Sequence, residues 1–362
     1  MPITANKGEW SELYVLFKLL GEKKLYAGDG DLNRLDASYP VLKIIRDELE
    51  RHLEYNIQCD IIVIAENGEE FARINTKDFV DFSQRLFGSI QQGGTGNGAF
   101  EIPWVNGFLQ QIRCQKVKAK SMDKSDIHIV IHDYHTGMNP NLGFSIKSEA
   151  GNSATILNAS PATVIRYKIN GDSCSDAFAD IINNITSKCK VQDRVVSIYN
   201  QHLTLNYYEM ENRTFANNLQ MIDSHLPEII AWMMADAYNN RDMDLERAVQ
   251  RITKANPMGY DLSEGHDYYG YKIKSLLVAT ALGMVPATTW TGRYDATGGY
   301  IIVKDDGDVI CFHIFDRNLL EDYLLKNSKF ETPTGKRYNL ARMYKDERND
   351  FFFNLVLQIR FK

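Results

Sequence analysis

The sequence predicts an α+β fold in which helices and strands are interspersed, without the regular βα alternation of a barrel. Two observations support this prediction. Apolar residues recur at helical spacing near the N-terminus and again across residues 213–282. Short runs rich in β-branched residues, bounded by Gly, Asn, Pro or Asp, occur at 124–131, 142–148 and 299–314. We therefore expect a core sheet flanked by helices, followed by an additional helical and C-terminal strand region.

The expected helices follow from apolar periodicity and from helix-ending residues. The first runs over residues 8–20, with an apolar stripe that starts at Trp10 and a stop at Gly21. In the helix expected at 76–87, Thr76 is the predicted N-cap. Further helices are expected at 39–53, 175–186, 213–237, 241–254, 268–282 and 317–327.

The expected strands are 59–65, 124–131, 142–148, 164–169, 195–199, 299–303, 309–314 and 351–361. A turn at residues 135–141 would fold the third of these beside the second as a hairpin. The segment 151–163 is rich in small hydroxyl and amide side chains, and is predicted to be a loop, either on the surface or along a sugar-phosphate backbone.

Composition narrows the class of protein. No apolar stretch reaches the length of a membrane helix, and the N-terminus has no secretory signal pattern. Five cysteines without a CxxC pair argue against a disulfide framework or a structural zinc site. A cytoplasmic protein with reduced thiols is expected.

The net charge of −6 disfavours a nonspecific nucleic-acid binder. The charge is unevenly distributed, however, and one stretch of the chain is basic. Residues 113–124 hold five basic residues and one acid. Lys116, Lys118 and Lys120 in this stretch are candidate phosphate contacts. A solvated surface explains the stretch equally well. Another charged group, Glu48, Glu50 and Glu54 with Arg46 and Arg51, is interpreted as the solvated face of a helix without a functional role.

The hairpin contains the candidate catalytic residues. Asp126 and Lys147 each stand in an otherwise apolar strand, and the fold-back brings their side chains toward one edge of a sheet. A carboxylate that binds Mg²⁺ and an ammonium group that steadies the attacking water are the minimum for phosphodiester hydrolysis. Ser145 shares the face of Lys147, whereas the side chain of Ile146 points into the core.

Further ligands are expected nearby. Glu12 or Glu9, on the N-terminal helix, would complete the pocket if that helix packs across the sheet edge. The backbone carbonyl of Ile146 is another candidate metal ligand. The neighbouring group His128, His132, Asp133 and His135 lacks zinc-site spacing; surface or hairpin-lining roles are expected, with His128 the only one considered for the nuclease site.

This arrangement resembles the PD-(D/E)xK nuclease superfamily with two departures, Ser125 in place of proline and Ser145 in place of the second acid. The blocks 6–20, 142–148, 155–160, 298–303 and 357–361 are similar to those of the HpaII family of type II restriction endonucleases, in the same order. In that family serine also precedes Ile-Lys, so Ser145 departs only from the superfamily.

The resemblance implies a Mg²⁺-dependent endonuclease that cuts double-stranded DNA at a short palindrome such as CCGG, with a cognate DNA methyltransferase acting on the same site. A homodimer on DNA and a monomer that nicks each strand in turn both remain open. Residues 1–200 are expected to form the nuclease core, and residues 201–362 to complete the DNA-binding cleft, either as two domains or as one continuous domain. Candidate DNA contacts beyond the lysines are Ser148, Thr155, Asn158 and Ser160.

Two alternatives stay open from the sequence. A sequence-specific DNA-binding protein with impaired cleavage would explain the missing acid at position 145. An α+β protein whose hairpin is purely structural would explain the net negative charge.

Overall fold

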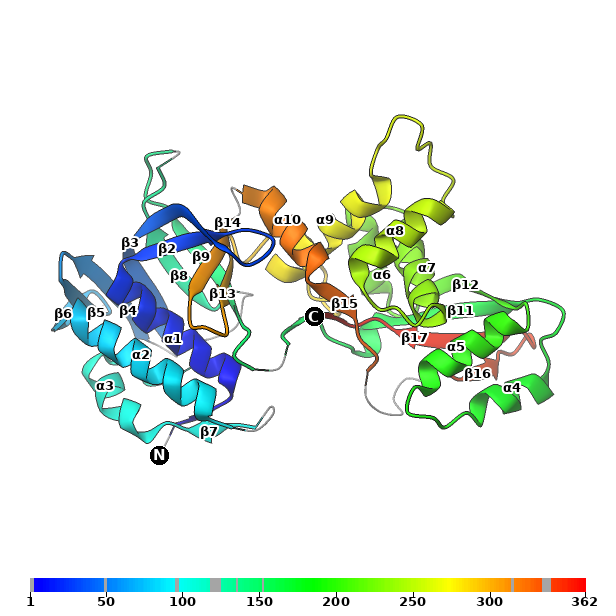
Figure 1. Ribbon diagram of the computed structural model, residues 1–362, viewed down its shortest axis with the longest axis horizontal. Coiled ribbons are helices and arrows are strands. Elements are labelled where there is room, and N and C mark those ends of the chain that lie inside the picture. Colours follow the sequence, from blue (N-terminus) through cyan, green and yellow to red (C-terminus); the bar gives the residue numbers. More distant parts are fainter. Residues whose placement is uncertain are drawn as a thin grey trace. The chain divides into compact units, whose positions relative to one another are not determined.

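The computed structural model describes residues 3–48, 51–94, 98–117, 125–134, 136–151, 153–313, 316–333 and 340–362. The chain forms two compact units (Figure 1), residues 1–154 with 294–323 and residues 155–293 with 324–362. Both units contain helices and strands, which confirms the α+β class. The chain leaves the first unit after residue 154 and returns to it at residue 294, where it adds two strands to the main sheet.

The helices of the first unit are α1 (Lys7–Glu22), α2 (Thr76–Gln92), α3 (Asn106–Gln111) and the 3-10 turn η1 (Pro103–Val105). A capping box starts α1: the Asn6 side chain accepts from the Glu9 amide at 3.0 Å, and the Glu9 carboxylate accepts from the Asn6 amide at 2.9 Å. Asn75, not Thr76, caps α2, by accepting from the Lys77 amide at 2.8 Å. Helices α1 and α2 lie side by side (Figure 1).

The main sheet of the first unit has the strand order β2-β14-β13-β9-β8-β3-β4-β5-β6, and β2 also pairs with β3. Its strands are β2 (Lys24–Gly28), β3 (Arg34–Glu48), β4 (Arg51–Gln58), β5 (Ile61–Glu66), β6 (Glu69–Asn75), β8 (Ile127–Ile131), β9 (Asn141–Ser148), β13 (Gly299–Val303) and β14 (Val309–His313). The pairs β13–β9 and β14–β2 are parallel, and the other pairs are antiparallel. A separate two-stranded sheet joins β1 (Thr4–Ala5) and β7 (Phe100–Glu101).

One face of this sheet forms the core with α1. Alternate residues of β9, Phe144 and Ile146, join the same buried cluster as Leu13 and Phe17 of α1. Ile301 of β13, which pairs with Ile146, belongs to that cluster too. The opposite face of β9 therefore carries the odd-numbered residues, among them Ser145 and Lys147.

The helix expected at residues 39–53 is wrong. This segment forms most of β3 and the start of β4. Val41, Ile44 and Ile45 are β-branched, which favours a strand, and burial along β3 roughly alternates. Arg46 and Glu48 are buried at 4% and 1% exposure, not solvated. Glu50 lies outside the described residues.

The second unit contains a four-stranded sheet, β12-β11-β17-β16, and a three-stranded sheet, β10-β18-β15. The strands are β10 (Thr155–Leu157), β11 (Val164–Asn170), β12 (Thr204–Met210), β15 (Ser328–Phe330), β16 (Met343–Lys345), β17 (Phe351–Val356) and β18 (Ile359–Phe361). The helices are η2 (Pro161–Thr163), α4 (Asp176–Asn183), α5 (Lys190–Asn200), α6 (Arg213–Ile222), α7 (Leu226–Asn239), α8 (Leu245–Ala255) and α9 (Tyr268–Leu282). Helix α10 (Arg317–Lys326) runs across the division at residue 323.

Three predictions for the second unit are corrected. Residues 195–199 belong to helix α5, because Val191, Val195 and Ile198 are buried at helical spacing. The expected helix 213–237 is two helices, α6 and α7; Pro227 stands in the first turn of α7, where its missing N–H costs nothing. The expected strand 351–361 is split into β17 and β18, which belong to different sheets.

Candidate active site

The predicted hairpin is present as β8 and β9. The two strands pair antiparallel, with Ile127 opposite Phe144 and Val130 opposite Asn141. Asp126 precedes β8 directly, and its amide donates to the Phe144 carbonyl at 2.8 Å. The hairpin thus holds the backbone of Asp126 beside the strand that carries Lys147.

Three side chains meet beside β9, at the point where β8 begins. The Asp126 carboxylate oxygen Oδ2 accepts from the Ile146 amide at 2.7 Å and from the Ser145 hydroxyl at 3.1 Å. The Lys147 ammonium donates to the Ser145 hydroxyl at 2.9 Å. Ser145 is buried, whereas Asp126 and Lys147 are half-buried. The arrangement places a carboxylate and an ammonium group on the two sides of one hydroxyl.

Tyr300 was missed by sequence reasoning. It lies on β13, pairs with Ser145, and is 1% exposed. The Lys147 Nζ lies 5.4 Å from the centroid of its ring, within the range of a cation–π interaction. Burial, and secondarily the Asp126 carboxylate, raise the pKa of the Tyr300 hydroxyl. Alternation in residues 299–303 predicts which residues share a face with Tyr300. It does not predict which strand pairs with this one.

Close packing fixes the strand that leads into Asp126. The Ser125 hydroxyl donates to the Asp295 carbonyl at 2.8 Å, and the Gly298 amide donates to the Gly143 carbonyl at 2.7 Å. A Cβ at Gly143 would lie 2.3 Å from the Ser125 hydroxyl oxygen, so no larger residue fits there without displacement. The side chain of Ser125 therefore anchors the backbone that leads into Asp126.

Helix α1 contacts β9 from the core side. The Ser11 hydroxyl lies 2.8 Å from the Ser148 hydroxyl, and it also donates to the Lys7 carbonyl. The next residue, Glu12, is buried at 8% exposure. Glu9 is occupied in the capping box at the start of α1, which gives it a structural role.

The predicted DNA contacts have different surroundings. Lys116 is exposed, while Lys118 and Lys120 lie outside the described residues. The hydroxyl of Ser148 bonds to Ser11 and accepts from the Ala150 amide. The remaining three belong to the second unit: Thr155 is on β10, Asn158 is exposed, and Ser160 caps η2 by accepting from the Ala162 amide.

Among its described members, the histidine group forms no metal cluster. The His132 Nδ1 lies 2.8 Å from the Asn139 side-chain oxygen, and the buried Asp133 accepts from the Thr136 hydroxyl at 2.6 Å. Both interactions stay within the hairpin turn. His128 is half-buried on β8, with the same strand parity as Asp126, and His135 lies outside the described residues. In the part of the chain that the structure describes, no group of three or more His, Cys, Asp or Glu residues could hold a metal ion.

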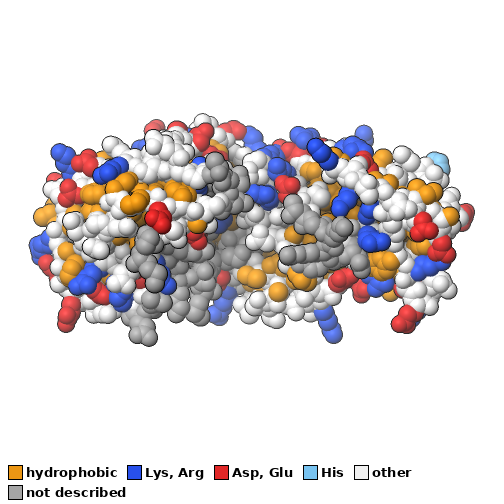
Figure 2. All heavy atoms as spheres, turned by 90° about the horizontal axis from the view of Figure 1, so that it is seen from below, with side chains coloured by type: hydrophobic (Ala, Val, Ile, Leu, Met, Phe, Trp, Pro, Cys, Tyr) orange, Lys and Arg blue, Asp and Glu red, His pale blue; other side chains and the backbone are white. Residues whose placement is uncertain are grey.

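Figure 2 shows Lys and Arg side chains interspersed with Asp and Glu side chains on the face that it presents, in keeping with the mildly acidic total charge. Among the described residues, no helix is both long and apolar enough to cross a membrane.

Two comparisons with known proteins match nearly the whole chain. The HpaII restriction endonuclease family matches residues 6–361. The type II restriction enzyme HpaII of Haemophilus parainfluenzae is 41% identical over 360 residues, which are 99% of this chain and 98% of that protein. No solved structure matches the chain. The match favours an enzyme over the impaired DNA-binding protein and over the purely structural protein: the chain belongs to the HpaII restriction endonuclease family and is a type II site-specific restriction endonuclease.

Proposed function

We propose that this enzyme hydrolyses both strands of duplex DNA with Mg²⁺, at a site built on a PD-(D/E)xK-type core in the first unit. The observation that carries the proposal is the contact series from Asp126 through Ser145 to Lys147. These contacts join a carboxylate, a hydroxyl and an ammonium group at the end of one hairpin. Asp126, Lys147, Ser145 and Glu12 are the proposed site residues, and Glu9 serves the helix cap.

The donor set suits a hard cation. Mg²⁺ usually takes one or two carboxylates, with carbonyl and water oxygens completing its shell, so a group of three acids is not required. Asp126 supplies a carboxylate, and Glu12 is the proposed second acid. The N–H and C=O of one strand residue point to the same side, so the Ile146 carbonyl is directed, like its amide, toward the side of Asp126. When bound, the ion would neutralise charge on the scissile phosphate and lower the pKa of the attacking water.

Lys147 would orient that water or stabilise the negative charge that develops on the phosphate. Ser145 holds the ammonium group in place by accepting a hydrogen bond from it. The Ser145 hydroxyl also donates to Asp126, so the two charged groups are coupled through one side chain. A serine here orients the neighbouring acid and base, where other PD-(D/E)xK enzymes use a second acid.

The recognition site proposed is CCGG, the type specificity implied by the family resemblance. Cutting a palindrome on both strands suggests a homodimer on DNA. Lys116 is a proposed phosphate contact because its side chain is exposed. A cognate DNA methyltransferase and a cytoplasmic location follow from the proposed role in restriction.

The test uses unmethylated phage DNA with the wild-type enzyme and with Lys147→Ala, each in Mg²⁺ or in EDTA. We expect discrete fragments whose ends share CCGG, only for the wild type and only with Mg²⁺. Fragments that share another motif would revise the specificity alone. Equal cutting by Lys147→Ala would remove Lys147 from the site, and cutting in EDTA would contradict the metal requirement.

A further inference from the structure

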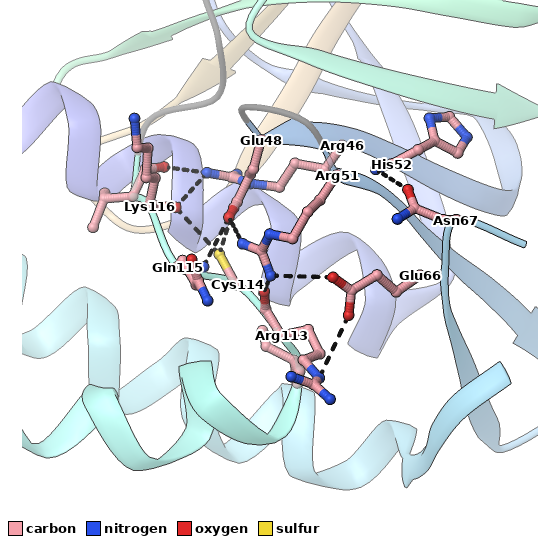
Figure 3. Close-up of polar contacts among 12 residues, drawn as sticks. Arg46, Glu48, Arg51, His52, Glu66, Asn67, Arg113, Cys114, Gln115 and Lys116 are labelled. Atoms are coloured by element: carbon pink, nitrogen blue, oxygen red, sulfur yellow. Dashed lines mark hydrogen bonds and ion pairs between the residues drawn. The ribbon is translucent and has the colours of Figure 1, made fainter. Parts of the chain in front are cut away.

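A buried arginine on β3 holds the basic segment that precedes Asp126 (Figure 3). Arg46 is 4% exposed, and its Nη2 donates to the carbonyls of Lys116 and Val117 at 2.6 and 2.7 Å. Its Nε donates to Glu48 at 2.8 Å. We call Arg46, Glu48 and these two carbonyls the Arg46 clamp. One guanidinium group thus connects the end of β3 to two consecutive backbone carbonyls in the segment 113–117.

The carboxylate of Glu48 is also fully engaged. Its second oxygen accepts from Arg51 Nη2 at 2.9 Å and from the Gln115 amide at 2.8 Å, and its first oxygen lies 3.3 Å from the Cys114 sulfur (Figure 3). Burying charges costs free energy that is offset only when each charge has partners with good geometry. Stability alone is a weak reason for such a pair, because apolar side chains can fill the same space. A better explanation for the buried pair is that it positions the segment 113–117.

The clamp lies at the same end of the sheet as Asp126. Strands β3 and β8 are antiparallel, with Ile45 opposite His128. Residues after Ile45 therefore extend toward the start of β8, which Asp126 precedes. Ser125, which directly precedes Asp126, donates from its hydroxyl to the Asp295 carbonyl.

Lys116 is the residue that this arrangement presents. Its carbonyl is held by Arg46 and lies 3.2 Å from the Cys114 sulfur, so its backbone is fixed from two sides. Its side chain is exposed and forms no ion pair with any residue that the structure describes. A fixed backbone beneath an exposed ammonium group is a preorganised contact for an anion, because less freedom is lost on binding.

We propose that Arg46 and Glu48 are positioning residues for DNA binding: the clamp fixes Lys116 so that its ammonium group contacts a phosphate of the DNA backbone. The inference rests on the proposed function for its ligand, duplex DNA. Arg46 acts through its planar fork, which reaches Glu48 and two carbonyls at once. A lysine has the same charge but cannot make all of these bonds in that geometry.

The experiment is a double-mutant cycle read by salt dependence. Binding of a short fluorescein-labelled duplex containing CCGG is measured in EDTA over a range of salt concentrations. Each phosphate contact contributes about one unit to the slope of log affinity against log salt. We expect Lys116→Ala to lower the slope by about one in the wild type, and to change it little in Arg46→Met or Arg46→Lys.

Arg194 provides the matched control, since it is also a buried arginine that donates to three backbone carbonyls, those of Ala341, Asn183 and Ile185. In Arg194→Met the effect of Lys116→Ala on the slope should remain complete. Turnover in Mg²⁺ gives a second readout: Arg46→Lys should raise KM with kcat near that of the wild type. A fall in kcat at unchanged KM would contradict a role in positioning a binding contact.

If Lys116→Ala changed the salt slope equally in all backgrounds, the proposed role of the clamp would be overturned. The absence of any change in the wild type would overturn it too. In either case, cleavage by the wild type would leave the proposed function intact. Thermal unfolding establishes which variants fold. If Arg46→Met does not fold, the comparison is made with Arg46→Lys. Hydrogen exchange needs no substitution: the Gln115 amide, which donates to Glu48, should be protected before DNA is added, and unprotected exchange would overturn the proposal.

Discussion

The Lys147 ammonium donates to the hydroxyl of Ser145, two residues earlier on the same strand, at 2.9 Å. Residues two apart on a strand share a face, so this contact follows from β9 itself. Ser145→Ala removes the acceptor and releases Lys147. We expect kcat to fall about tenfold or more, because a positioned charge loses its orientation. Single-turnover cleavage of a plasmid measures it; Ser145→Thr, which keeps the hydroxyl, is the control. Unchanged turnover in Ser145→Ala would remove the serine from the site.

Tyr300 supports Lys147 from the neighbouring strand. Its ring centroid lies 5.4 Å from the Lys147 Nζ, in a buried position. Tyr300→Phe keeps the ring, whereas Tyr300→Leu removes the cation–π interaction, which contributes on the order of 1 kcal/mol or more when desolvated. We expect kcat to decrease severalfold in Tyr300→Leu relative to Tyr300→Phe, at similar KM. Equal kcat values in the two variants would show that the ring does not support the lysine.

Asp126 has a structural role in the hairpin and a proposed role as a metal ligand. An asparagine at this position still accepts from the Ile146 amide and the Ser145 hydroxyl, but it carries no charge. We therefore expect Asp126→Asn to fold, to bind DNA, and to lose Mg²⁺-dependent cleavage by at least about a hundredfold. Isothermal titration with Mg²⁺ in the presence of uncleaved DNA should show weakened binding of the ion. Normal ion affinity in the variant would exclude Asp126 as a ligand.

The buried pair of Arg46 and Glu48 makes a prediction about stability. Glu48→Ala leaves the Arg46 charge buried without its carboxylate partner, which typically costs about 3–5 kcal/mol. Urea unfolding, monitored by fluorescence, should show a large fall in the free energy of unfolding. Glu70→Ala breaks the exposed pair with Arg73 and is expected to have little effect. Similar losses in the two variants would mean that the buried pair is not specially coupled.

His52 gives a pH dependence. Its Nδ1 lies 2.7 Å from the Asp47 carboxylate, and this hydrogen bond raises the pKa of His52 above its ordinary value of 6.5. A raised pKa in the folded state means that the histidine stabilises the protein fully below pH 6.5 and loses this contribution as the pH rises through the folded-state pKa. The thermal midpoint of the wild type relative to His52→Gln should therefore decrease over that range. A difference that stays constant with pH would refute it.

The sequence by itself determined the residues that belong to the hairpin. Alternation in residues 127–131 and 142–148, with turn-forming residues between, predicts two antiparallel strands, because such signals are local. It also placed Ser145 and Lys147 on one face. The same local pattern failed for residues 39–53, since a run of apolar and charged residues fits a helix as well as a strand until its partners are known.

Only the tertiary structure decided which distant segments meet. Tyr300 reaches Lys147 because β13 pairs with β9 in parallel, across more than a hundred residues of chain that belong to the second unit. Arg46 and Glu48 are buried because residues 113–117 pack over them and supply carbonyl and amide partners. Neither relationship leaves a periodic signal in the sequence. Periodicity reports the burial of a face, while the partners of a buried charge are set by long-range pairing.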